Sequence, residues 1–492
     1  MLSSINRLFN SQIQPWPNPL KTNQLPSEIK IAVCENHARY PDLQLLADDD
    51  TVNITNDYCA KPSDLDASCS QMAGLKGPCT EYNRSQVALL CFKWIRDGVV
   101  KAFAQFTQPQ PEAKRLSRPE FQALHDKYTA LKLNLLQYGL KSNDTDDVID
   151  ALIVLGDMGK SETARARVKE LLENEENVPA DADDFKKYCV EQDVFDVFQV
   201  YRNLGPLQKE LVKGCILREI HLGHGTHAEN GKHPYEALEK NRAPHPIEIN
   251  GEVLKIPPEI LFDLAEFVHI NDVAGAQGHK GNQGSLMYTT DVYRKINIVS
   301  KAARSLITDP NKTAADAYYD VLTEMCKYIG FDKILPITDQ SPLQDKVTAL
   351  LFQHRRALPK NLSSSNDLDS LYDLVGSLPQ ETLENLWDNF GVDAEIYNTY
   401  MPALLNAEPV KDLDGLKVCL DKILPCLAKK YHEIGFNETP PPLNVNKLIP
   451  KLGIIINSVQ NDAQSLEKIL KVNENGEAEF IEQEIPADAK MA

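Results

Sequence analysis

The run from Val148 to Leu155 most constrains the fold of this 492-residue chain, because apolar residues occupy every side of the helix that it would form. Asn143 and Asp144 precede the run, and such residues commonly cap the start of a helix. A surface helix carries one apolar stripe, whereas a helix that is apolar all round has to be enclosed by other elements. We therefore predict a buried helix over residues 143–157.

The helical period recurs along most of the chain. Apolar residues at three- and four-residue spacing predict a helix over 84–107, and Ser117, followed by Pro119 and Glu120, predicts a capped helix that ends at Leu136. By the same patterns, helices are expected at 161–175, 183–201, 206–220, 257–269 and 289–306, with several more within 312–470. The fold class is therefore mainly α.

Breaks in these patterns divide the chain into four regions. Residues 1–115 form an N-terminal, cysteine-containing region that is irregular or mixed, with short apolar runs such as Ile29–Cys34 that could be strands. Residues 116–310 are the central helical domain, and residues 311–470 are a C-terminal helical region without a fixed repeat. Residues 471–492 are acidic, and this composition predicts a flexible tail.

The overall charge limits the classes of partner. The net charge of −19 repels nucleic-acid phosphates and anionic lipid surfaces, so we expect neither a nucleic-acid nor a membrane partner. Ten cysteines in a chain of this length, without a Cys-x-x-Cys pair, are typical of reduced intracellular thiols. These features predict a cytoplasmic protein.

Histidines concentrate in one part of the central domain. Of the eleven histidines, seven fall within residues 221–279, and the densest stretch has a histidine every third position beside Glu229. Histidine can ligate a metal and carry protons near neutral pH, so this crowding indicates a site; a solvated, glycine-broken loop is the alternative. The histidines of the dense stretch are His221, His224 and His227.

The buried helix ends in the string Gly156-Asp-Met-Gly-Lys-Ser161, which has two interpretations. A phosphate-binding loop of nucleotide hydrolases would need a glycine where Val154 stands and a preceding strand, so this interpretation is not favoured. The string resembles instead the His-Asp-x-Gly-Lys motif of metal-dependent phosphohydrolases of the HD superfamily, with Gly156 in place of the histidine.

A second string extends this resemblance over residues 120–300. Glu266, His269 and Asp272 are spaced three apart, and Val273-Ala-Gly-Ala-Gln-Gly-His279 follows them. Together with His227-Ala-Glu-Asn230, the strings are similar to an uncharacterised group of HD-like proteins in fungi and bacteria. The resemblance implies a divalent ion, of unspecified identity, that polarises a phosphoryl group and activates a water.

The resemblance also implies roles for particular residues. We expect the chain to hydrolyse a phosphate ester or a phosphodiester of unspecified structure, with Lys160 contacting the phosphate and Glu229 or His279 carrying protons. The missing histidine at position 156 would be replaced by one from the dense stretch, or the site would bind without cleaving. The expected metal ligands are His125, Asp157, His224, His227, His269 and Asp272.

A cysteine site is an alternative. Cys79 precedes a predicted helix, whose N-terminal amides and dipole would stabilise a thiolate, as in papain-like proteases, deamidases and transglutaminases. A half-buried structural cysteine is the simpler interpretation. The residues that could complete such a site are His227, His233 or His245 with Gln277 or Asn282.

Two further interpretations concern binding and export. The C-terminal helices could form an interaction surface, in which Leu350–Leu358 combines apolar and basic residues that suit an acidic protein partner. The chain would then be a non-catalytic protein on a degenerate HD-like scaffold. The acidic tail also resembles the C-terminal export signals of bacterial type IV secretion effectors, which implies, as an alternative location, the cytosol of a host cell.

Overall fold

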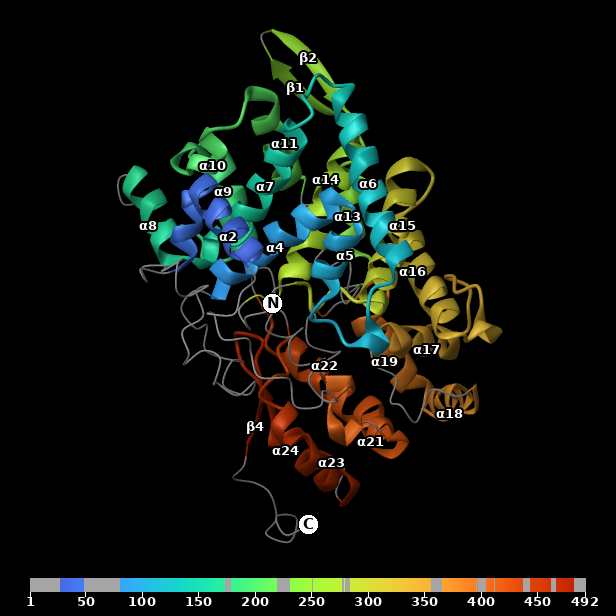
Figure 1. The fold of residues 1–492 in the computed structure, drawn as a ribbon. Helices are drawn as coiled ribbons and strands as arrows, with labels where there is room; N and C mark the ends of the chain where they lie inside the picture. The colour runs from blue at the N-terminus through green and yellow to red at the C-terminus, as the bar shows by residue number, and fades with distance from the viewer. Residues whose placement is uncertain are drawn as a thin grey trace.

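The computed structural model describes residues 27–47, 80–172, 178–218, 231–249, 251–276, 278, 284–354, 365–394, 396, 404–410, 412–436, 443–461 and 466–481. These residues are mainly helical, as the apolar spacing predicts (Figure 1). Their strands form two antiparallel hairpins, β1–β2 (His245–Ile249 with Glu252–Ile256) and β3–β4 (Leu470–Val472 with Ala478–Phe480). Among the described helices, none is both long enough and apolar enough to cross a membrane.

The first half of the chain packs around one hydrophobic core. Its helices are α2 (Ser27–Arg39), η2 (Pro41–Ala47), α4 (Thr80–Asp97), α5 (Val100–Thr107), η3 (Glu112–Lys114), α6 (Arg118–Leu136), α7 (Asp144–Leu155), η4 (Met158–Lys160), α8 (Glu162–Leu171), α9 (Ala182–Glu191), η5 (Phe195–Val197), α10 (Gln199–Arg202), α11 (Pro206–Leu217) and α14 (Pro258–Gly275). Helix α13 (His233–Lys240), between α11 and α14 in the chain, instead contributes Tyr235 and Leu238 to the core of the second half.

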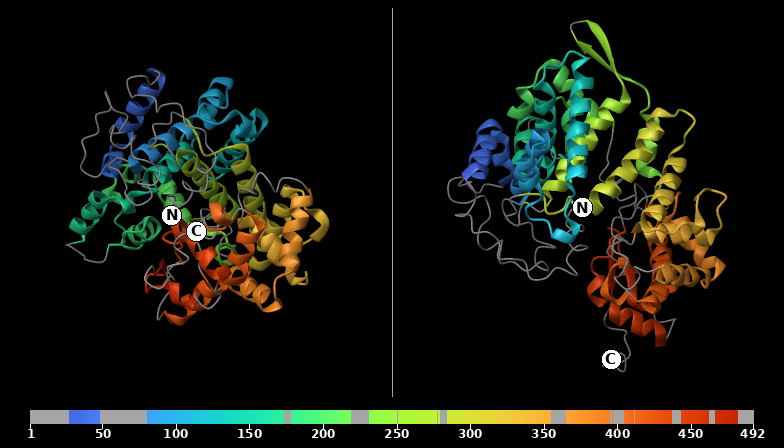
Figure 2. Two further views of the ribbon diagram at one scale, coloured as in Figure 1. Left: turned by 90° about the horizontal axis from the view of Figure 1, so that it is seen from below. Right: turned by 45° about the vertical axis from the view of Figure 1, so that its right-hand side comes forward.

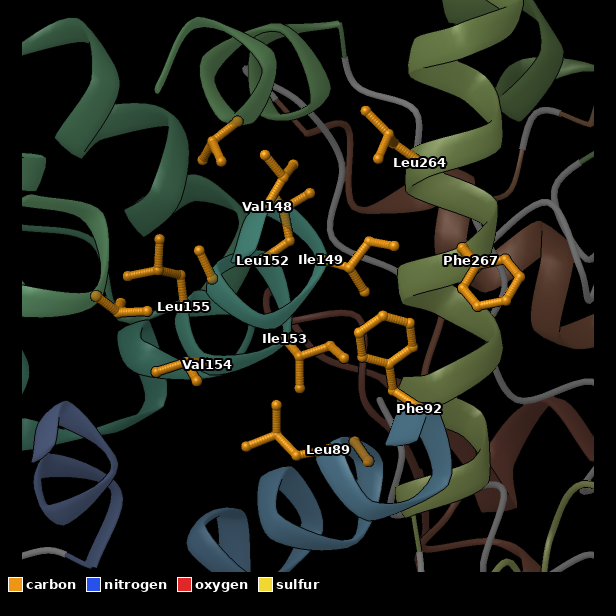
Figure 3. Packing of buried hydrophobic residues seen from close by; sticks show 14 of the residues in the cluster. Leu89, Phe92, Val148, Ile149, Leu152, Ile153, Val154, Leu155, Leu264 and Phe267 are labelled. Atoms are coloured by element: carbon orange, nitrogen blue, oxygen red, sulfur yellow. The ribbon is translucent and has the colours of Figure 1, made fainter. Parts of the chain in front are cut away.

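Helix α7 is the predicted buried helix. Every residue from Val148 to Leu155 is buried, and Figure 3 shows its apolar side chains facing α4 on one side and α14 on another. Phe92 of α4 and Phe267 of α14 pack edge to face beside it. Since burying one such side chain contributes roughly 1.5–3 kcal/mol, α7 is a main source of stability for this half.

Two local features define the neighbours of α7. Ser117 and Glu120 form the capping box that starts α6, as predicted. The helix predicted over residues 84–107 is in fact two helices, because Gly98 adopts a φ of +65° between α4 and α5. Such a conformation is open to glycine and ends the first helix.

The helices of the second half lie beside those of the first (Figure 2) and pack around another core. α14 and α15 contribute residues to both cores, so they join the two halves. The helices from α15 onward are α15 (Thr290–Thr308), α16 (Ala314–Ile329), η7 (Asp332–Ile334), α17 (Leu343–His354), α18 (Ser365–Gly376), α19 (Gln380–Phe390), η9 (Glu408–Val410), α21 (Leu413–Val418), the π-helical turn η10 (Cys419–Ile423), α22 (Leu424–Glu433), η11 (Ile449–Lys451), α23 (Leu452–Asn461) and α24 (Leu466–Ile469).

Three expectations differ from the structure. Residues 29–34, which could be strands, lie in helix α2, because Ile29, Ala32 and Val33 form a buried helical stripe. The helix expected over 183–201 is interrupted between α9 and α10. The first part of the expected flexible tail forms hairpin β3–β4, in which Val472 and Ala478 are buried; residues 482–492 lie outside the described residues.

The apolar part of the proposed docking segment is not on the surface. Leu350, Leu351 and Phe352 of α17 are buried in the second core. Residues 355–358, which include the two arginines, lie outside the described residues. Leu350, Leu351 and Phe352 therefore act as core residues.

Candidate functional site

Charged side chains from three segments meet at one place in the first core. They come from the first turns of α4, from the turn that joins α7 to η4, and from the last turns of α14. We refer to these five residues, Glu81, Arg84, Asp157, Lys160 and Asp272, as the Arg84 cluster.

Arg84 lies at the centre of this cluster. Its Nη1 donates a hydrogen bond to Glu81 Oε2 at 2.7 Å. Its Nη2 lies 3.6 Å from Asp272 Oδ1 and 4.0 Å from Asp157 Oδ2, so both aspartates are within ion-pair distance of the same nitrogen. Lys160 donates to Asp157 and lies 3.4 Å from Glu81 Oε2. Two cations thus sit among three carboxylates.

Close backbone packing brings α14 to α4. A Cβ atom at Gly275 would lie 2.5 Å from the carbonyl oxygen of Arg84, and one at Gly278 would lie 2.4 Å from that of Asn83. Both distances are shorter than real Cβ contacts, so only glycine permits this approach. The end of α14 therefore lies directly against the first turns of α4, and Asp272 reaches Arg84 from there.

The carboxylates of the Arg84 cluster have pKa values that are shifted in opposite directions. Burial opposes ionisation of Asp157, but the charges of Lys160 and Arg84 outweigh it and hold the pKa of Asp157 well below its ordinary value. Burial raises the pKa of Glu81, with a further contribution from the charge of Asp157. Asp272 has a side chain that is 41% exposed, yet desolvation by its crowded surroundings and the charge of Asp157 raise its pKa. Asp157 is therefore the carboxylate most firmly held in its ionised form.

His125 is not part of the Arg84 cluster. Its Nδ1 lies 2.9 Å from the carbonyl oxygen of Ile95, near the other end of α4. Ile95 and Arg84 are about three helical turns apart on α4. The structure therefore does not bring His125 to Asp157, because its position along the sequence gave no information about which end of α4 it would face.

The carboxylates of the second string have different partners. Glu266 is fully buried and pairs with Lys127 of α6, whereas Asp272 faces Arg84 of α4. His269 is half-buried between them on α14. Of the residues singled out from the sequence, Asp157, Lys160 and Asp272 are therefore brought together.

Several expected site residues lie outside the described part of the chain. Within the described ranges, no group of three or more His, Cys, Asp or Glu side chains is arranged to hold a metal ion. The expected residues without a described position are Cys79, His221, His224, His227, Glu229, Gln277, His279 and Asn282.

Of the three histidines named as possible partners of Cys79, His233 and His245 are among the described residues. His233, at the start of α13, is near Glu236 and the carbonyl oxygen of Ala394. His245 is on β1, and a Cβ atom at Gly214 of α11 would contact its ring. Burial and the charge of Arg218 lower the pKa of His245. Neither contacts the Arg84 cluster through these interactions.

Four of the described cysteines are buried thiols with raised pKa values. Cys91, Cys189, Cys215 and Cys326 are buried, and burial raises the pKa of each thiol, to about 12 for the last three. A thiol with a raised pKa is a poor nucleophile at neutral pH. These four positions therefore do not compete with Cys79 as candidate nucleophiles.

Glu81 and Arg84 belong to no motif that the sequence displays. One signal did exist: they stand at the start of a helix whose following residues, Val87 to Phe92, are all buried. A charged pair in such surroundings needs partners from other elements, because isolated buried charges are strongly unfavourable.

A second group of carboxylates lies at the start of α7. Tyr40 donates a hydrogen bond to Asp150, and Tyr128 donates one to Asp146. Arg39 contacts Asp150 at 3.9 Å, and Arg96 contacts Asp146 at 3.3 Å. Burial raises the pKa of Asp150 to about 6. These contacts tie the segment after α2 to α7.

No protein-family profile matches this sequence, and no curated protein or solved structure shows significant similarity to it.

Proposed function

We propose that this chain hydrolyses a phosphate ester or a phosphodiester at the Arg84 cluster, with the help of a divalent ion. One observation carries the proposal: Asp157 and Lys160 from one motif-like string and Asp272 from the other lie around a single guanidinium group. Phosphohydrolases need carboxylates to hold an ion and cations to neutralise a phosphate. The Arg84 cluster contains both.

The described residues supply part of a metal site. Asp157 and Asp272 offer oxygen ligands, which suit magnesium or manganese. A further ligand would come from His224 or His227, outside the described residues. When bound, the ion would polarise the phosphoryl group and lower the pKa of a water molecule. Because Lys160 donates to Asp157, an ion at Asp157 competes with that contact.

The chain's overall charge makes the two cations important. A net charge of −19 repels phosphate groups in general, so a phosphate needs local positive charge to bind. Arg84 and Lys160 provide it within one cluster. Lys160, released from Asp157, would contact the substrate phosphate.

The proposal is tested with a panel of phosphate esters and diesters in the presence of magnesium or manganese. We expect hydrolysis by the wild type and its loss in Asp157→Asn and Asp272→Asn, with Asp126→Asn, an exposed residue of α6, as the matched control. Bound ion should also raise the stability, by roughly 2.7 kcal/mol at one hundred times its dissociation constant. Absence of hydrolysis, together with no bound metal and unchanged melting after chelation, would contradict the proposal and favour a non-catalytic binding protein.

A cysteine-dependent protease, deamidase or transglutaminase is the second candidate. The observation that favours it is the start of α4 at Thr80, directly after Cys79 in the chain. A long helix at that point offers amides and a dipole that stabilise a thiolate.

The two candidates give opposite results for one pair of variants. The phosphohydrolase requires Asp157 and tolerates Cys79→Ala. The cysteine enzyme requires Cys79 for its covalent intermediate, on an amide substrate. It also predicts that iodoacetamide labels Cys79 before the other nine cysteines at neutral pH. Selective labelling of Cys79 with loss of activity would replace the first candidate by the second.

A further inference from the structure

One edge of the buried Arg84 guanidinium has no hydrogen-bond partner among the described residues. Its side chain is 6% exposed, and its Nη1 is engaged with Glu81. Among the residues that the structure describes, its Nε and Nη2 have no hydrogen-bond partner. The hydrogens on Nε and Nη2 point in parallel from one edge of the planar guanidinium. Such an edge matches two oxygens of one carboxylate or phosphate group.

The neighbouring aspartates do not satisfy this edge. Asp272 Oδ1 is 3.6 Å and Asp157 Oδ2 is 4.0 Å from Nη2, and hydrogen bonds of this type span 2.7–3.2 Å. Both aspartates attract the guanidinium, but neither forms a hydrogen bond with it. Buried polar groups in native proteins are almost always hydrogen-bonded, so an unpartnered pair on a buried arginine points to a missing ligand.

The surroundings favour an anion at this edge. Lys160 neutralises Asp157, and the charge of Lys186 on α9 also reaches Asp272. Since the Asp272 side chain is 41% exposed, the cluster reaches solvent on that side.

We propose that the Nε–Nη2 edge of Arg84 binds one phosphate group of the substrate through two of its oxygens, which makes Arg84 a specificity-determining residue. The identity of the anion rests on the proposed function. The geometry itself requires an oxoanion with two accessible oxygens, and phosphate is the oxoanion on which that function acts.

Binding of inorganic phosphate to the full chain, without divalent ions and with chelator present, tests this inference. Isothermal titration or thermal shift should show saturable binding of phosphate but not of chloride at equal ionic strength. Arg84→Lys keeps the charge but lacks the two parallel donors, so we expect at least a tenfold loss of phosphate affinity. Arg96→Lys, on the same helix and paired with Asp146, is the matched control and should bind as the wild type does.

A second variant keeps the test decisive if Arg84→Lys does not fold. Asp272→Asn removes a negative charge beside the edge and should increase phosphate affinity severalfold. Equal phosphate affinity of the wild type and Arg84→Lys would overturn the inference. If Arg84→Lys does not fold, an unchanged phosphate affinity of Asp272→Asn would overturn it. Binding of a dicarboxylate such as succinate in place of phosphate would overturn the identity of the anion.

The inference and the proposed function can fail separately. If phosphate binding depends on Arg84 but no ester is hydrolysed, the phosphate subsite stands and the proposed hydrolase function does not. If the protein hydrolyses an ester but Arg84→Lys has the same phosphate affinity as the wild type, the proposed function stands and the phosphate subsite at Arg84 does not.

Discussion

Lys160 Nζ lies 3.4 Å from Glu81 Oε2 and also donates to Asp157, so one ammonium group links carboxylates from two separate segments. Lys160→Met should lower the free energy of unfolding by about 3 kcal/mol, because it leaves buried carboxylates with one cation fewer. Denaturant unfolding measures this change. Lys114→Met, at an exposed position of η3, should change stability by less than about 0.5 kcal/mol. Similar effects of both variants would show that the Lys160 contacts contribute little.

The packing around α7 gives a second prediction. Ile149 is fully buried, so Ile149→Ala should destabilise the protein by about 2–5 kcal/mol through lost burial and a cavity. Leu133→Ala removes a side chain that is 57% exposed on α6 and should have little effect. Thermal unfolding of both variants tests the difference, and a small effect of Ile149→Ala would mean that α7 is less tightly packed than the structure shows.

The start of α6 gives a third prediction. Ser117→Ala removes the side chain that accepts a hydrogen bond from the amide of Glu120, and should destabilise by about 1 kcal/mol. Ser117→Gly should cost only a few tenths of a kcal/mol, because glycine is itself tolerated at this position. Chemical denaturation ranks the two variants, and the opposite order would contradict the capping role.

Asp150 gives a prediction about pH. Burial raises its pKa to about 6, above the ordinary value of 3.8, so the folded state binds a proton more readily than the unfolded state does. The contribution of this group to stability is therefore present below about pH 4 and is lost as pH rises through about 6. From pH 5.5 to pH 8, Asp150→Asn should gain about 1 kcal/mol relative to the wild type.

The control for this experiment is another carboxylate of α7. Asp147 is half-buried and pairs with Arg39, and burial raises its pKa, whereas Asp150 is almost fully buried. Asp147→Asn should therefore show a weaker dependence on pH. A constant difference between Asp150→Asn and the wild type over this range would contradict the raised pKa.

Local patterns predicted the helices well, and long-range relationships less well. Apolar spacing located α7, and Ser117 with Glu120 located the start of α6, because these signals depend only on neighbouring residues. The run Ile29–Cys34 was ambiguous, since a short apolar run satisfies strand alternation and helical spacing equally. Its helical form is decided by burial of Ile29 and Val33 in the first core.

The candidate site could be predicted only in part. Asp157, Lys160 and Asp272 were identified from motif-like strings, and the structure places these three together. Glu81 and Arg84 could not be found in this way, because charges on a helix more often indicate a solvated face. His125 lies near the other end of α4, a position that sequence spacing could not predict, because spacing does not tell which end of a neighbouring helix a side chain faces.

The position of α7 also has a consequence for synthesis of the chain. α7 contacts α4, made before it, but also α11 and α14, made after it. A nascent chain that has emerged only as far as residue 155 therefore exposes an apolar helix whose remaining partners do not yet exist. The first core can close only after about a hundred further residues have left the ribosome, which at 5–20 residues per second takes roughly 5–20 s. During that interval, the apolar faces of α7 that later contact α11 and α14 lack their native cover.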